Sequence, residues 1–177
     1  GVFGQIDSFE SNDPIATPER LKRLESYFLD WRWTLRKYQH RCSRTHGDFH
    51  PFNILFRDND DFTLLDCSRG AAGEPADDVC CLSLNYLFFS LVASGQVGRG
   101  MLSLWRTFWD TYLQETLDEE LFEVSAPFIA WRCLVLANPL WYPDLDDQCR
   151  DRILTLAQRC LETSRVEPDL IVDALAS

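Results

Sequence analysis

Three oxygen-bearing side chains near the middle of the chain could together serve phosphate chemistry. Asp48 lies in a turn, Asn53 follows five residues later, and Asp66 closes the mostly apolar run of residues 62–65. Magnesium bound to phosphates takes oxygen ligands from one or two protein carboxylates, and phosphates and waters complete its shell. A carboxylate beside an attacking hydroxyl can also take its proton. These residues therefore indicate a magnesium-phosphate site for phosphoryl transfer.

A short hairpin is expected to bring these groups together. Residues 54–57 and 62–65 are typical of strands, and residues 58–60 have the composition of a tight turn. Pairing of the two strands would place Asn53 and Asp66 at the same end of the hairpin. The acidic tip would point away from them.

Helices are expected to support this hairpin on both sides. Thr17 and Pro18 are typical of a helix start, and apolar residues then recur every three or four positions up to Tyr38. Residues 1–16 are predicted to be an irregular lead-in, and residues 67–77 a loop. Further helices are predicted at residues 79–93, 101–115, 119–125, 127–137 and 146–162, with a short amphipathic tail after Pro168. The predicted fold class is mainly α with one small β-hairpin, as a single domain over residues 17–177.

Composition limits the classes of partner. The 177 residues carry a net charge of −11, so nucleic acid is not an expected partner. A cationic substrate is compatible with this field, although an acidic surface also serves solubility alone. The seven cysteines include no C-x-x-C pair and mostly lie among apolar residues, which predicts buried reduced thiols in a cytoplasmic protein. The longest apolar run, residues 79–93, is too short to span a bilayer, so no membrane is expected.

Three motifs carry a resemblance to a known family. Residues 46–53, HGDFHPFN, resemble the catalytic loop of the aminoglycoside phosphotransferase and choline kinase superfamily, which has a protein-kinase-like fold. Residues 64–66, LLD, are similar to its metal-binding segment, and residues 73–79, GEPADDV, to the loop and helix start that follow. They occur in the family's order and spacing, and the resemblance covers about residues 17–162, the helical C-terminal lobe. The chain departs from the family after Asp66, where it has Cys67-Ser68-Arg69-Gly70.

The resemblance implies a role for each matching residue. Asp48 would be the base, and Asn53 and Asp66 would bind Mg²⁺ on ATP. Taken alone, Asp48 could equally be a turn carboxylate, Asn53 a strand-entry residue and Asp66 a strand-end cap. Asp78 would buttress the loop or simply cap the next helix. His46 is expected to orient the loop, and His50 to shape it or to contact substrate.

The acceptor side is open to two interpretations. In this family the later helices line the acceptor pocket, so Trp131, Trp141 and Asp144 are candidate contacts for a cationic acceptor. The alternative is that they serve the structure. Trp105 and Trp109 are expected in the core because of their helical spacing, and Asp146 and Asp147 are expected to cap a helix.

The segment before the turn limits the functional prediction. About 44 residues precede it, and they contain no glycine-rich phosphate loop and no strand lysine in a V-A-I-K setting. An N-terminal ATP-gripping lobe is therefore expected to be absent, and a homodimer or a partner lobe would cover the upstream face, near residues 1–16 and the turn. The predicted function is a small-molecule kinase that moves the γ-phosphate of ATP to a hydroxyl and is incomplete as this chain. The alternative is a binding or scaffolding domain derived from such a kinase.

Overall fold

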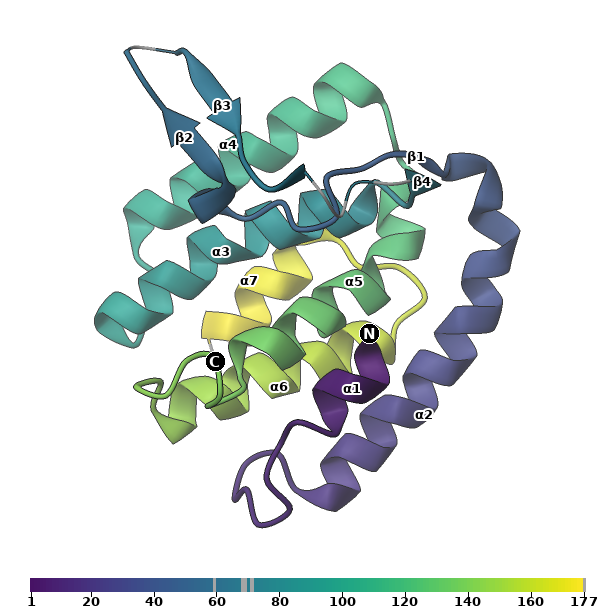
Figure 1. Ribbon diagram of the computed structural model, residues 1–177, viewed down its shortest axis with the longest axis vertical. Coiled ribbons are helices and arrows are strands. Elements are labelled where there is room, and N and C mark those ends of the chain that lie inside the picture. Colours follow the sequence, from purple (N-terminus) through teal and green to yellow (C-terminus); the bar gives the residue numbers. More distant parts are fainter. Residues whose placement is uncertain (59, 68–69, 71, 177) are drawn as a thin grey trace.

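The computed structural model is a helical domain in which α3, α5 and α6 lie at the centre, and α2, α4 and α7 add buried residues to the same core (Figure 1). It describes residues 1–58, 60–67, 70 and 72–176. The helices are α1 (Val2–Ile6), α2 (Pro18–Thr34), α3 (Ala76–Ser94), α4 (Arg99–Thr116), α5 (Leu121–Leu136), α6 (Asp147–Leu161) and α7 (Pro168–Ala176), with 3-10 turns η1 (Leu35–Arg41) and η2 (Pro51–Asn53). The predicted mainly α fold class is confirmed.

The predicted hairpin is present, and a second small antiparallel ladder accompanies it among the described residues. Strand β2 (Ile54–Phe56) pairs with β3 (Phe62–Leu64), as expected. Strand β1 (Ser43–Arg44) pairs with β4 (Ala72–Gly73), a ladder that the sequence did not indicate because each strand has only two residues. Gly73 suits this pairing, since a Cβ there would lie 2.8 Å from Thr45 Oγ1.

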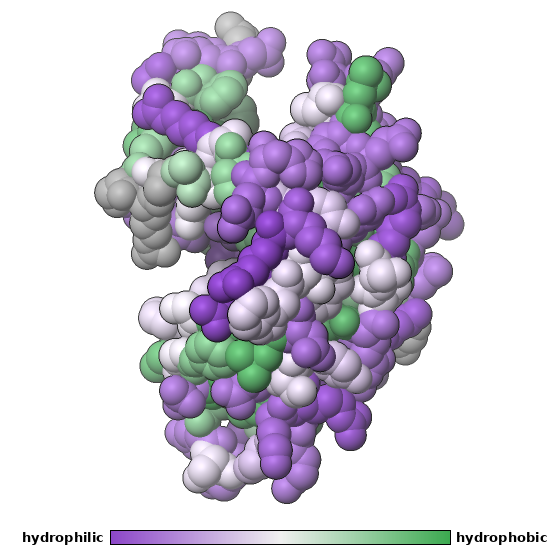
Figure 2. All heavy atoms as spheres, turned by 90° about the vertical axis from the view of Figure 1, so that its right-hand side faces the viewer, coloured by the Kyte–Doolittle hydropathy of each residue, from purple (hydrophilic) through white to green (hydrophobic). Residues whose placement is uncertain are grey.

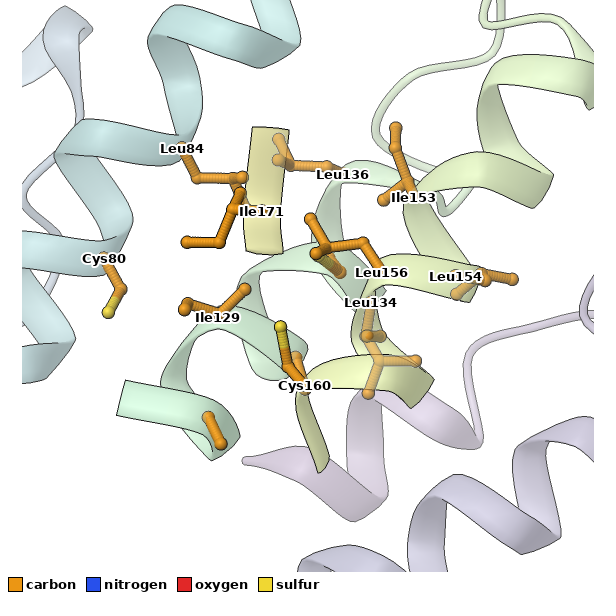
Figure 3. Packing of buried hydrophobic residues seen from close by; sticks show 14 of the residues in the cluster. Cys80, Leu84, Ile129, Leu134, Leu136, Ile153, Leu154, Leu156, Cys160 and Ile171 are labelled. Carbon is orange, nitrogen blue, oxygen red and sulfur yellow. The ribbon is translucent and has the colours of Figure 1, made fainter. Parts of the chain in front are cut away.

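The central helix α3 is mostly buried and contributes many residues to the core. It packs against α4 and α5, and α5 packs in turn against α6. Figure 3 shows side chains of α3, α5, α6 and α7 that meet in this core. By length and composition α3 could cross a membrane, and it is longer than the predicted residues 79–93, but 67% of the relevant window is buried inside the fold. A helix that is apolar nearly all round and covered by neighbours is a core helix.

Helix boundaries differ from the predictions at three places. Residues 1–16 are not wholly irregular, because they contain α1, which packs against α2 and α5. The predicted break near residue 126 is wrong, and α5 continues through Pro127, which is buried among core residues on both sides. Helix α3 begins at Ala76 rather than after Asp77 or Asp78. Packing outweighed the local signals in each case.

Other local predictions are confirmed. The Thr17 hydroxyl accepts a hydrogen bond from Arg20 N at 3.3 Å and caps α2, and Asp146 caps α6 in the same way. Trp105 and Trp109 are fully buried. Five cysteines are buried, while Cys42 and Cys67 are exposed; none of the seven is in a disulfide. The face shown in Figure 2 is mainly hydrophilic, with apolar side chains in separate patches, in keeping with the acidic composition.

Candidate active site

The turn of residues 45–53 is held by a carboxylate from α3. Asp78 accepts hydrogen bonds from His46 N at 2.6 Å and from Gly47 N at 2.9 Å. Gly47 has a φ of +80°, which side-chain-bearing residues rarely adopt. Asp78 therefore ties the turn to α3 instead of capping the helix, and the turn crosses α3 in Figure 1.

Asp48 lies between two cationic or ionisable groups. Its Oδ2 is 3.8 Å from His50 Nε2, and its Oδ1 is 3.6 Å from Arg132 Nη2 of α5. The side chain is only 16% exposed. Asp48 thus connects the turn, which follows β1, with a helix more than 80 residues further along the chain.

Asn53 and Asp66 lie at the base of the β2–β3 hairpin, as predicted from the strand pattern. The Asn53 side chain donates to Asp48 O at 2.9 Å, and its Nδ2 is 3.2 Å from His50 Nε2. The Asn53 carbonyl accepts from Leu65 N at 2.9 Å. Asp66 follows with a φ of +52°, so the chain bends sharply at this carboxylate.

His46 links the turn to the same strand end. Its Nε2 faces Leu65 O at 2.8 Å, so this nitrogen carries the proton in the arrangement that makes a hydrogen bond. The ring is buried and lies 5.6 Å from the Phe49 ring, centroid to centroid. His46 therefore fixes the position of the residue that precedes Asp66.

A cavity of about 520 Å³ opens beside Asp48, between α3 and α5. One stripe of α3, spaced every four residues, forms its floor: Asp77, Cys81 and Asn85. A second stripe, on α5, faces it, and the aromatic side chains around the opening complete it. These further lining residues are Phe128, Trp131, Arg132 and Val135 of α5 with Phe52, Trp141 and Tyr142.

The cavity contains two of the three predicted acceptor contacts. Trp131 and Trp141 line it, whereas Asp144 is exposed and does not. Sequence reasoning missed Arg132 and Asp77. Arg132 could have been noticed, because it is the only charged residue of α5 after Glu123 and lies in an otherwise apolar helix.

Burial and neighbouring charges shift the pKa values of two groups on the cavity floor. Desolvation, with the negative charges of Asp78 and Asp48, raises the pKa of Asp77 to about 6, while Arg132 opposes this shift. Desolvation also raises the pKa of the Cys81 thiol to about 12, so the thiol is neutral near pH 7. Cys81 is therefore a neutral part of the cavity floor.

The protein oxygens near the turn suit a hard cation shared with phosphates. Among the described residues there is no cluster of three His, Cys, Asp or Glu side chains that could hold a metal alone. Asn53 uses its amide nitrogen within the turn, so its amide oxygen is the atom that could act as a ligand beside Asp66. One carboxylate and one amide fit Mg²⁺ that takes its other ligands from a nucleotide. Ser68 and Arg69 of the predicted metal segment lie outside the described residues.

A helical lobe with a buttressed turn, a paired hairpin and an adjacent cavity defines a kinase-like phosphotransferase. The model of the phosphotransferase enzyme family, APH, matches residues 8–100, just over half of the chain, and the protein belongs to this family. The match covers the turn, the hairpin and α3, but not the α5 side of the cavity. No curated protein and no solved structure gave a significant match.

Proposed function

We propose that this chain is the catalytic and acceptor-binding lobe of an ATP-dependent kinase for a small hydroxylated molecule. The observation that supports it most is the position of Asp48. This carboxylate lies at the wall of a cavity large enough for a small acceptor, and its backbone carbonyl is bonded to Asn53, a candidate magnesium ligand. Acceptor and metal sites would thus meet at one residue.

Each residue of the turn has a definite task in this proposal. Asp48 accepts the proton of the acceptor hydroxyl, late in a loose transition state, and orients the oxygen towards the γ-phosphate. His50 and Arg132 hold the two oxygens of Asp48 from opposite sides. Asn53 and Asp66 would hold Mg²⁺, which when bound neutralises charge on the phosphates. Asp78 and His46 keep the turn in place.

The exposed surface around the hairpin favours contact with a second lobe. Six apolar side chains there, which we call the hairpin patch, are exposed: Phe52, Leu55, Phe56, Phe62, Leu64 and Leu65. Apolar clusters of this kind mark contact surfaces in natural proteins. The patch adjoins Asn53 and Asp66, so an ATP-gripping lobe, from further sequence or another chain, would cover it while placing nucleotide at the turn.

The test uses the protein encoded by the whole gene, with ATP and Mg²⁺ and a panel of small hydroxylated acceptors. Asp48→Ala should abolish phosphate transfer, and Asp48→Asn should reduce kcat by roughly 10²–10⁴-fold, the contribution of a positioned base. Exposed Asp110→Asn on α4 is the control and should leave turnover unchanged. Retained turnover in Asp48→Ala would refute the role of Asp48.

A second proposal is a binding domain without transfer activity, in which the exposed hairpin patch contacts a partner protein instead of an ATP-gripping lobe. Calorimetric titration of this chain with Mg²⁺ and ATP separates the two. Micromolar ATP binding by the chain alone would contradict the view that a second lobe is needed to hold nucleotide. If neither the chain nor the full protein binds ATP, the binding domain remains.

A further inference from the structure

Arg132 places a positive charge in a cavity whose other lining residues are acidic, polar or apolar. Its side chain is 12% exposed and reaches from α5 towards Asp48 of the turn and Cys81 of α3. Two carboxylates, Asp48 and Asp77, line the cavity with it, and His50 of the turn lies beside Asp48. No other arginine or lysine lines this cavity among the described residues.

The protein partners of Arg132 engage only some of the N–H donors of its guanidinium group. A guanidinium has five N–H donors and no acceptor. Among the described residues, its one hydrogen bond goes to the Cys81 sulfur, a weak acceptor, and its contact with Asp48 is an ion pair at 3.6 Å rather than a hydrogen bond. Its Nε is buried and has no hydrogen-bond partner in this part of the protein. Buried donors of this strength normally have strong acceptors.

An acceptor molecule in the cavity would meet the terminal Nη donors of Arg132 next to Asp48. The group beside Arg132 must therefore be an oxygen, because an ammonium group also only donates and would repel the guanidinium. The Trp131 and Trp141 rings remain available as apolar walls for the carbon skeleton. Both the positive charge and the N–H donors of Arg132 therefore favour an oxygen atom of the bound molecule at this position.

We propose that Arg132 determines acceptor specificity: it selects a molecule in which an oxygen of a carboxylate or second hydroxyl neighbours the reacting hydroxyl, and it excludes a fixed positive charge there. This inference rests on the proposed function, since it takes the α3–α5 cavity as the acceptor pocket. Arg132 is a binding residue for the acceptor, while Asp48 remains the base. The acidic net charge of the whole chain does not decide which acceptor binds, because distant charges are screened and the charges within the cavity dominate.

The experiment measures binding to this chain without ATP, using D-glycerate and choline as probes. The indole N–H signals of Trp131 and Trp141, both in the cavity wall, are followed by ¹H–¹⁵N NMR during each titration. The wild-type chain should bind glycerate more tightly than choline. Arg132→Gln should reduce the ratio of glycerate affinity to choline affinity at least about tenfold, because one charge-assisted hydrogen bond to glycerate is lost.

Two further variants identify the cause. Arg132→Lys keeps the charge but not the fork of donors, so it should still exclude choline while binding glycerate less tightly. Arg23→Gln, at an exposed position of α2, makes the same change in net charge away from the cavity and should leave both affinities unchanged.

The inference is overturned if choline binds the wild-type chain as tightly as glycerate, if Arg132→Gln leaves the ratio unchanged, or if glycerate moves neither indole signal. Phosphate transfer is not needed for this measurement. A protein that shows the expected binding but transfers no phosphate from ATP would refute the proposed function alone.

Discussion

At the scale of single residues, two adjacent carboxylates of α3 have opposite tasks. Asp78 receives two backbone N–H groups and fixes the turn, whereas Asp77 faces the cavity and has its pKa raised to about 6. Neighbouring positions on a helix point about 100° apart, which is why Asp78 binds the turn while Asp77 faces the cavity. The difference comes from orientation, since both residues are aspartate.

Removal of the Asp78 carboxylate should destabilise the protein and loosen the turn. Asp78→Ala leaves the N–H groups of His46 and Gly47 without their acceptor, and we expect a loss of about 1.5–3 kcal/mol in the free energy of unfolding, typical for hydrogen bonds to a charged group. Urea denaturation measures this loss. Asp110→Ala, at an exposed site on α4, should change stability by less than about 0.5 kcal/mol. Equal losses in the two variants would contradict the proposed support.

Asp77 should make stability depend on pH between about 4 and 6. Its folded-state pKa of about 6 exceeds the ordinary value of 3.8, so the folded protein holds a proton that the unfolded chain has released. The free energy of unfolding should therefore fall as the pH rises through this window, by at most about 3 kcal/mol. Asp77→Asn should remove this component while other carboxylates keep theirs. A pH profile of stability identical in the two proteins would rule out the shift.

At the scale of elements, one arginine joins three segments behind the turn. The Arg41 side chain at the end of η1 is only 7% exposed, and it pairs with Glu74 before α3 and with Asp118 between α4 and α5. Helix α2 with η1 is thereby attached to the loop that begins α3. This ion-pair network helps to fix the end of the chain segment that leads into β1 and the turn.

Buried and exposed arginine pairs allow a direct comparison. Arg41→Met leaves the partly buried Glu74 and Asp118 without their cation, so we expect a loss of about 3–5 kcal/mol. Arg57 pairs with Asp61 at the surface, where solvent screens the charges, so Arg57→Met should cost much less than Arg41→Met. Thermal and urea unfolding of both variants check the difference. A larger loss in Arg57→Met would reverse the expected order.

At the scale of the whole molecule, the hairpin patch exposes apolar side chains to water in the isolated chain. Phe56 and Phe62 are opposite each other in the β2–β3 ladder, their rings are 5.9 Å apart, and both are more than half exposed. A two-stranded hairpin is also marginally stable by itself. Both properties favour contact with another lobe or with a second copy.

The chain should therefore associate with itself at high concentration when no second lobe is present. Phe56→Ser combined with Phe62→Ser removes two exposed aromatic rings of the hairpin patch and should shift sedimentation towards monomer. Leu29→Ser combined with Trp33→Ser, which removes two exposed apolar side chains of α2, serves as the control. A wild-type chain that stays monomeric at the highest soluble concentration would contradict this expectation.

Local patterns in the sequence were sufficient for several features of the site. Strand pairing placed Asn53 and Asp66 at one end of the hairpin, and the spacing of motifs indicated the family that residues 8–100 confirm. The cap at Thr17 and the buried Trp105 and Trp109 also followed from local rules. Such features depend on neighbours within a few residues, where backbone geometry and periodicity decide the outcome.

The tertiary structure alone decided what lies opposite Asp48. Arg132 is 84 positions further along the chain, and the packing of α3 against α5 brings it within 3.6 Å of that carboxylate. The same packing turned Asp77 towards the cavity, kept α5 continuous through Pro127 and left Asp144 outside. Charges in contact across two helices have no sequence spacing that could reveal them, because the distance between them is set by how the core packs. The sequence thus determined which residues form the turn, and the packing of the helices decided which residues lie opposite it.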